Sequence, residues 1–165
     1  MTAQGSGPAV DVHVGLGQIR LARGGSLSIH GLGSCVAVAF WSREPRVAVM
    51  CHVLLPASSQ DVRGGDPGRS ADLALPHGLD LIRAQGAAPA QVTVKLAGGA
   101  VLFAGAGGAL AVGPRNVAAC LEALQALGLR PAASDLGGRL GRSVTLDVAT
   151  GALTVRRFGA EAVTL

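Results

Sequence analysis

Short apolar runs separated by polar or glycine-containing turns are the feature of this sequence that most limits its fold. Residues 36–40 and 47–52 form one pair of such runs, and residues 143–148 and 152–158 form another. Runs of this length that are rich in valine and have turn residues on both sides are typical of β-strands. The segments between the paired runs are short, so the sequence predicts two antiparallel hairpins.

Only two segments have helical periodicity. In the first, Ser70 is a predicted N-cap, and Leu75, Leu79 and Ile82 share one helical face. Pro76 leaves two alternatives open, because the helix either has a distorted first turn or starts near the proline.

The second predicted helix begins at Pro114 and stops at Gly128, a residue type that commonly ends helices. Many strands together with two helices predict an α+β fold rather than a doubly wound α/β sheet. The apolar stripe of this second helix comprises Val117, Cys120, Leu121, Leu124 and Leu127.

The length and composition predict one globular domain over residues 1–165, with residues 1–9 as a flexible tail. The chain has 165 residues, of which 49% are hydrophobic. No apolar run approaches the roughly 18 residues of a membrane-spanning helix, and no secretory signal is recognisable at the start. The three cysteines are irregularly spaced, which favours reduced thiols in a cytoplasmic protein that is not inserted in a membrane.

The charge pattern argues against nucleic-acid binding. The net charge is +4, but the basic residues are dispersed, and the chain has no tyrosine, one tryptophan and three phenylalanines. Nucleic-acid binding usually requires a basic face with aromatic platforms. A mild preference for an acidic protein partner remains open, and nothing in the sequence indicates a cofactor.

The segment GLGSC, residues 31–35, places a cysteine at the start of the first predicted hairpin. If the hairpin is centred between Arg43 and Glu44, Cys35 faces His52 on one side of the sheet. Directly opposed side chains have Cβ atoms about 4.5–5.5 Å apart. A neighbouring imidazole stabilises a thiolate, so this register predicts a nucleophile that reacts below the ordinary thiol pKa of about 8.5.

The turn before the cysteine fits the same chemistry. Gly33 and Ser34 allow the backbone to approach a substrate closely, and the N–H of Cys35 is a candidate oxyanion donor. Two alternatives stay open for the cysteine itself. It is either a small buried apolar residue, or a zinc ligand in a set without the usual zinc spacing. That set comprises Cys35, Cys51, His30 and His52.

The remaining cysteines and histidines are predicted to have no catalytic role. Cys51 is next to the candidate histidine in sequence and therefore points to the opposite face of the strand. Cys120 lies on the apolar stripe of the second helix and is predicted to be core. His13 and His77 have no motif around them, and His30 is placed in a turn.

Seven blocks of the sequence form an ordered set: GLGSCVAV at 31–38, MCHVLLP at 50–56, RSADLAL at 69–75, KLAGGA at 95–100, VGPRNV at 112–117, DLGGRLGRSV at 135–144 and TGALTV at 150–155. Together they resemble the CheD family of bacterial chemotaxis, and the resemblance extends over about residues 10–158.

The resemblance implies a layered α/β/β/α sandwich of mixed sheets, similar to deamidating-toxin-like cysteine hydrolases. It implies a protein-glutamine deamidase that converts Gln to Glu on the cytoplasmic helical bundle of methyl-accepting chemotaxis receptors. The nucleophile of the family falls on Cys35 and its histidine on His52, and the reaction passes through a thioester. A CheC-type phosphatase is a further partner that the family implies.

One departure from the family pattern concerns the third catalytic residue. The family commonly has threonine six residues before the cysteine, where this chain has Ile29. Ser28 is adjacent, but on a regular strand it points to the other side unless a bulge shifts it. Orientation of His52 is therefore expected from Ser28, a backbone carbonyl or water. The alternative function is a weakly active or inactive docking module that binds receptor or phosphatase.

Overall fold

The computed structural model describes residues 10–61, 63–103, 105 and 111–165, so the predicted tail at 1–9 lies outside the described residues. The elements, in chain order, are β1 (Asp11–His13), β2 (Ile19–Ala22), β3 (Ser26–Leu32), β4 (Val36–Ser42), β5 (Val47–Val53), α1 (Ala71–Ala84), β6 (Val92–Gly98), α2 (Val112–Ala126), β7 (Pro131–Leu136), β8 (Arg142–Asp147), β9 (Leu153–Arg157) and β10 (Val163–Thr164), with short 3₁₀ turns at Ser58–Gln60, Pro67–Arg69 and Pro89–Gln91.

Two five-stranded mixed sheets face each other, which confirms the predicted α+β class. One sheet has the order β1-β3-β8-β9-β10 and the other β2-β5-β4-β6-β7. Each sheet contains one parallel pair, β1 with β3 and β6 with β7. The predicted hairpins β4–β5 and β8–β9 are both present.

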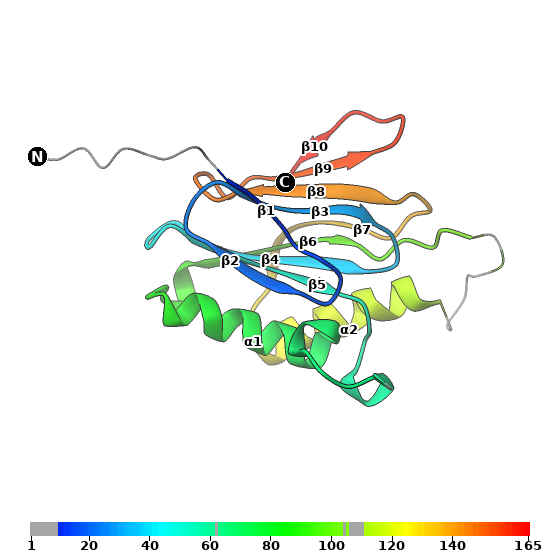
Figure 1. Ribbon diagram of the computed structural model, residues 1–165, viewed down its shortest axis with the longest axis horizontal. Helices are drawn as coiled ribbons and strands as arrows, with labels where there is room; N and C mark the ends of the chain where they lie inside the picture. The colour runs from blue at the N-terminus through cyan, green and yellow to red at the C-terminus, as the bar shows by residue number, and fades with distance from the viewer. Residues whose placement is uncertain (1–9, 62, 104, 106–110) are drawn as a thin grey trace, which may run out of the picture.

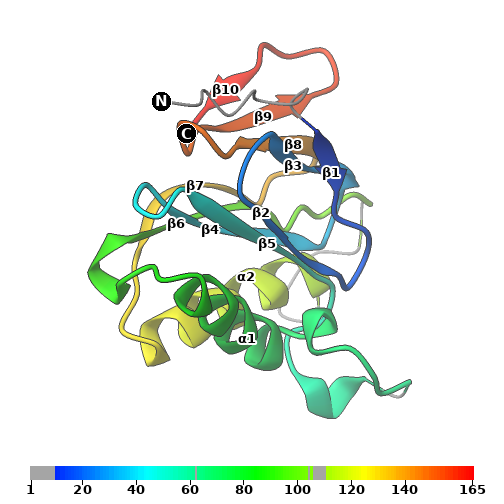
Figure 2. The ribbon, with the colours of Figure 1, turned by 60° about the vertical axis from the view of Figure 1, so that its left-hand side comes forward.

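Both helices cover the outer face of the second sheet (Figures 1 and 2). Among the described residues the layers therefore run sheet, sheet, helices, and the second helical layer implied by the family resemblance is not seen. The described residues contain two α-helices, and these two pack side by side. No helix among the described residues is both long and apolar enough to cross a membrane.

The core has two parts, which meet at the central strands β4 and β5. Val36, Val38 and Phe40 face the helices, whereas Ala37 and Ala39 face the other sheet. Successive residues of a strand point to opposite faces, so one strand supplies both cores. The alanines on the inner face let the two sheets approach closely.

The helix boundaries follow the sequence signals closely. Helix α1 begins directly after Ser70, so Pro76 lies inside the helix and does not begin it. Leu75, Leu79 and Ile82 are buried as predicted.

Helix α2 begins two residues before the predicted Pro114 and is followed by Gly128 in the left-handed region at φ +72°. Within its predicted stripe, Cys120 and Leu124 are fully buried, whereas Leu121 is 39% exposed. Glycine adopts this backbone conformation without a Cβ penalty, which explains the stop.

Candidate active site

Cys35 lies in the connection between β3 and β4, immediately before the first residue of β4. Its side chain is half-buried and packs against the core between the two sheets. The end of β5, the end of β6 and the start of α2 lie at this same end of the molecule, on the right in Figure 1. The cysteine is therefore held at the edge of the layer between the sheets.

The register of the β4–β5 hairpin differs from the predicted one. Ala37 is paired with His52, whereas the predicted register paired Cys35 with it. The strands extend through Trp41 and Ser42, so the hairpin is centred between Glu44 and Pro45. A shift of two residues leaves every side chain on its predicted face.

Cys35 and His52 consequently share a face of the sheet but are diagonal neighbours instead of opposed ones. Diagonal neighbours remain within reach of longer side chains. Among the described residues, no hydrogen bond joins the thiol to the imidazole. The register thus places both groups on the inner face of the sheet, with Cys35 two residues before the partner of His52.

His52 is buried, and its Nδ1 lies 3.1 Å from the carbonyl oxygen of Val14. A carbonyl only accepts hydrogen bonds, so Nδ1 carries the proton and Nε2 keeps its lone pair in the neutral ring. The N–H of Val14 in turn donates to the carbonyl of Ser28 at 2.7 Å. The segment between β1 and β2 therefore connects the histidine to the opposite sheet.

The two residues considered for the third position have other surroundings. The Ser28 hydroxyl donates to the carboxylate of Asp11 at 2.9 Å. Ile29 is fully buried in the core between the sheets. His30 was predicted in a turn but belongs to β3, is exposed, and stacks on His13 with ring centroids 5.3 Å apart. Of the two protein groups predicted to orient His52, the backbone carbonyl is the one in contact with it.

Burial keeps both groups of the candidate pair uncharged at rest. It raises the pKa of the Cys35 thiol above its ordinary value. Burial also lowers the pKa of His52, an effect that the Val14 carbonyl opposes and the charge of His13 reinforces. A neutral thiol beside a neutral imidazole differs from the expected thiolate, because desolvation disfavours whichever form carries charge.

The turn at residues 33–35 is connected to the end of β6 by backbone hydrogen bonds. The N–H of Ala100 donates to the Gly33 carbonyl at 3.0 Å, and the N–H of Gly99 donates to the Cys35 carbonyl at 2.8 Å. Gly98 has φ +121°, and a Cβ there would lie 2.2 Å from the Cys35 carbonyl oxygen. Only glycine combines this backbone conformation with so close an approach.

The other two cysteines lie in the helical half of the core, as predicted. Cys51 and Cys120 are fully buried, and the Cys51 thiol lies 3.6 Å from the carbonyl of Ala74 in α1. Burial raises the pKa of both thiols, to about 12 for Cys120. Cys51 thus points away from His52, and the four side chains of the zinc alternative do not converge.

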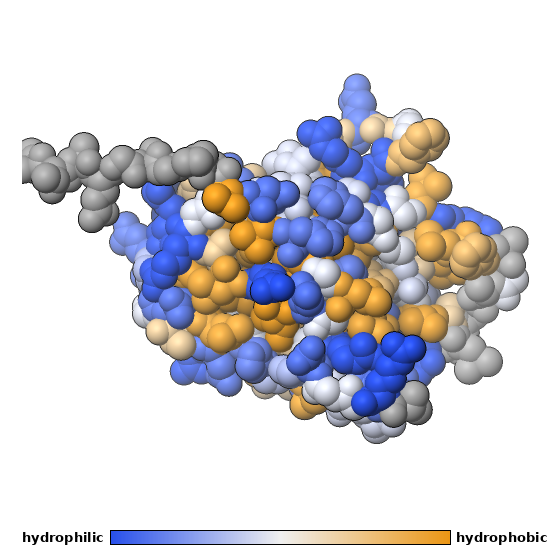
Figure 3. Space-filling view, in the orientation of Figure 1, coloured by the Kyte–Doolittle hydropathy of each residue, from blue (hydrophilic) through white to orange (hydrophobic). Residues whose placement is uncertain are grey.

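An apolar pocket of about 180 Å³ lies beside Ser34. Leu102 and Phe103, which are 45% and 73% exposed, are among its lining residues. The space-filling view shows hydrophobic side chains at this end of the molecule (Figure 3). The turn that contains Ser34 therefore borders an apolar surface open to solvent.

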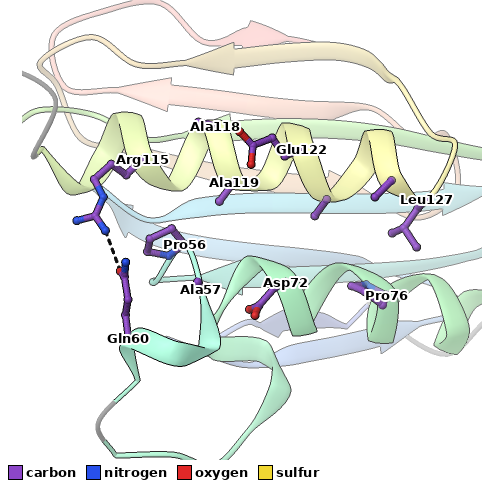
Figure 4. Close-up of a pocket in the computed structure, with 12 residues that line it drawn as sticks. Pro56, Ala57, Gln60, Asp72, Pro76, Arg115, Ala118, Ala119, Glu122 and Leu127 are labelled. Atoms are coloured by element: carbon purple, nitrogen blue, oxygen red, sulfur yellow. Dashed lines mark hydrogen bonds between the residues drawn. The ribbon is translucent and has the colours of Figure 1, made fainter.

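A second hollow, a groove of about 610 Å³, lies between α1 and α2 (Figure 4). It is lined by both helices and by the segment before α1, where Arg115 donates to Gln60 at 2.9 Å. This groove belongs to the helical layer, on the other side of the sheet from the face that carries Cys35 and His52.

Two contributors to the site were missed by the sequence analysis. The Val14 carbonyl is a backbone group, so no side-chain pattern marks it. Asn116 lies within the VGPRNV block, yet no role was predicted for it. It is fully buried on α2 and donates to the carbonyls of Ser34 and Leu54. A single amide on an otherwise apolar helix face was the available signal.

The fold and the site define an α+β protein with a half-buried cysteine and a buried histidine on one face of a central sheet. Comparison with known sequences identifies the family. A family model described as "CheD chemotactic sensory transduction" matches residues 54–157. The chain belongs to the CheD family.

Curated relatives match over most of their length. A protein of Methanococcus maripaludis strain C6 is 42% identical over 134 residues, which cover 81% of this chain and 86% of the relative. A protein of Desulforamulus reducens strain MI-1 is 36% identical over 152 residues, covering 90% and 92%. Each is named "Probable chemoreceptor glutamine deamidase CheD". Family membership therefore rests on nearly the whole chain.

Proposed function

We propose that the protein is a chemoreceptor glutamine deamidase that hydrolyses side-chain amides with Cys35 as nucleophile and His52 as base. One observation carries the proposal. The half-buried Cys35 shares a sheet face with the buried His52, and His52 donates its Nδ1 proton to the Val14 carbonyl. Nε2 is then the basic atom of that imidazole. The names of the relatives supply the substrate class.

The uncharged resting pair suits a general-base mechanism. His52 takes the thiol proton as the sulfur of Cys35 attacks the amide carbon of glutamine, and a tetrahedral oxyanion forms. Collapse of this intermediate breaks the C–N bond, and the imidazolium returns the proton to the leaving ammonia. A water molecule, deprotonated by His52, then hydrolyses the thioester to give glutamate and the free thiol. The turn at Gly33 and Ser34 is proposed to border the oxyanion.

The proposed substrate is the cytoplasmic helical bundle of methyl-accepting chemotaxis receptors, with the protein acting in the cytoplasm. The apolar pocket beside Ser34 supports docking of a protein surface next to the nucleophile. The likeness to deamidating-toxin-like cysteine hydrolases stays part of this proposal.

A docking module with little turnover is the second candidate. It is favoured by Ile29, which has no hydroxyl where the family commonly has threonine, and by the protonated resting thiol of Cys35. Such a module would bind receptor, or a CheC-type phosphatase, without changing it.

Mass spectrometry of a chemoreceptor cytoplasmic fragment tests the choice. The fragment is incubated with wild-type protein, with Cys35→Ala and with the matched control Cys51→Ala. Replacement of a glutamine NH₂ by OH is expected with the wild type and with Cys51→Ala, and not with Cys35→Ala. Unchanged mass on a fragment that binds the protein would favour the docking module. Modification by Cys35→Ala would contradict the proposed nucleophile.

A further inference from the structure

Asn116 connects the turn before Cys35 with the segment after His52. It is the only asparagine of the chain and lies in α2, fully buried. Its side-chain Nδ2 donates to the carbonyl of Ser34 at 3.0 Å and to the carbonyl of Leu54 at 3.1 Å. Ser34 precedes Cys35 directly, and Leu54 follows the histidine by two residues. One amide therefore connects the nucleophile turn with the end of β5.

We propose that Asn116 is a positioning residue that directs the backbone N–H of Cys35 toward the oxyanion of the reaction. The inference rests on the proposed function. The peptide unit between Ser34 and Cys35 is planar and trans, so its C=O and N–H point in opposite directions. A donor that holds the Ser34 carbonyl on the α2 side consequently directs the Cys35 N–H away from α2.

The hydrogen bonds of the turn support this orientation. The carbonyls of Gly33, Ser34 and Cys35 each accept a hydrogen bond, from Ala100, Asn116 and Gly99. For the N–H of Cys35, no acceptor is found in the part of the chain that the structure describes. A turn whose carbonyls are all bound elsewhere, with a free N–H next to a thiol, is the arrangement that an oxyanion site needs.

The chemistry of the side chain makes asparagine specific at this position. Both partners of Asn116 are carbonyls, so only the NH₂ group satisfies them and the amide orientation is determined. Its Oδ1 is buried without a hydrogen-bond partner among the described residues. An unpaired buried oxygen disfavours folding. The two donated hydrogen bonds therefore have to outweigh the cost of this unpaired oxygen.

Two reagents separate an oxyanion role from a structural one. With p-nitrophenyl acetate, the sulfur of Cys35 bonds to the acetyl carbon, an oxyanion forms, and p-nitrophenolate leaves while His52 takes the thiol proton. With iodoacetamide, the sulfur bonds to a methylene carbon and iodide leaves while His52 takes the thiol proton, and no oxyanion forms. A change in thiol exposure or thiol pKa alters both rates, whereas a misdirected N–H alters only the first.

The test compares both rates in the wild type, Asn116→Ala and the control Cys120→Ala. Cys120 is buried one turn further along the same helix and has no hydrogen bond to the nucleophile turn. We expect Asn116→Ala to slow acylation about 10- to 100-fold, below the loss of about 10²–10³ for a deleted oxyanion donor. Its alkylation rate and alkylation pH profile should match the wild type, and Cys120→Ala should leave both rates unchanged. If Asn116→Ala does not fold, Asn116→Gln, which keeps the NH₂ group on a longer side chain, replaces it.

Equal loss of both rates, or no loss of acylation, would overturn the positioning role. Wild-type acylation no faster than that of a small thiol of equal pKa would also overturn it. Failure of the proposed function gives a different result. If acylation depends on Asn116 but no receptor fragment is deamidated, the substrate assignment is wrong and the role of Asn116 stands.

Discussion

Replacement of Gly98 by alanine should damage both stability and the candidate site. The residue has φ +121°, which non-glycine residues adopt only with strain of about 1–3 kcal/mol. The added Cβ would also lie 2.2 Å from the Cys35 carbonyl oxygen. The strands must separate there, which removes the hydrogen bond from Gly99 to Cys35, worth about 1 kcal/mol net. With overpacking of about 1–3 kcal/mol, we expect a total loss of about 3–7 kcal/mol.

Two other glycines separate the contributions to this loss. Gly128 has φ +72° with nothing within 4 Å of a Cβ, so Gly128→Ala has strain without a clash. Gly113 has no positive φ, but its Cβ would lie 2.4 Å from the Ala100 carbonyl, so Gly113→Ala has a clash without strain. We expect about 1 kcal/mol for Gly128→Ala and an intermediate value for Gly113→Ala.

Urea unfolding followed by circular dichroism measures the three free energies, and iodoacetamide labelling reports on Cys35 in the folded variants. Gly98→Ala should be the least stable of the three and the most altered in labelling rate. A Gly98→Ala protein no less stable than Gly128→Ala would refute the reasoning, because it would show that β4 and β6 separate there without penalty.

Four further predictions concern the candidate pair and its surroundings. Cys51→Ser should keep turnover on a receptor fragment while losing roughly 1–3 kcal/mol on unfolding, because a hydroxyl enters an apolar core; loss of turnover would contradict the face assignment. Burial lowers the pKa of His52, so activity should persist below pH 6.5, and the stability contributed by its neutral form should fall as pH drops below that ordinary value, as urea titrations across pH would show. Burial raises the pKa of Cys35, so its pH dependence runs in the opposite direction. The stability contributed by the protonated thiol should decline as pH rises above the ordinary value of 9.0. Ile29→Thr should cost about 1–2 kcal/mol in urea unfolding without lowering kcat on the receptor fragment; a large fall in kcat would show that the isoleucine itself shapes the site.

The sequence predicted well those features that depend on local periodicity. The alternation of side chains along β5 predicted that Cys51 and His52 point to opposite faces of the sheet, and the structure confirms it. The stop at Gly128 followed from the preference of glycine for positive φ. Both features are decided within a few residues of the chain. Neither requires knowledge of which distant segments come together.

Long-range strand pairing and the contacts of backbone groups could not be predicted from the sequence. The hairpin register was wrong by two residues because Trp41 and Ser42 continue the strand, a choice that packing against β6 stabilises. The Val14 carbonyl reaches His52 across 38 positions of sequence, and every residue has a carbonyl. The position of Asn116 beside Ser34 likewise depends on helix packing. Composition and periodicity contain none of this information.

Burial favours the neutral forms of Cys35 and His52. In the proposed mechanism, catalysis therefore depends more on the groups around the thiol than on a preformed thiolate. A thiolate stabilised in advance would react with any electrophile, whereas a protonated Cys35 becomes nucleophilic only as His52 removes its proton. The driving force for that transfer must then come from groups that meet the charge developing on the substrate. In the proposed mechanism, those groups belong to the turn held by Asn116 and the Gly98 region. Substitutions there should consequently impair acylation more than they impair alkylation of the same sulfur.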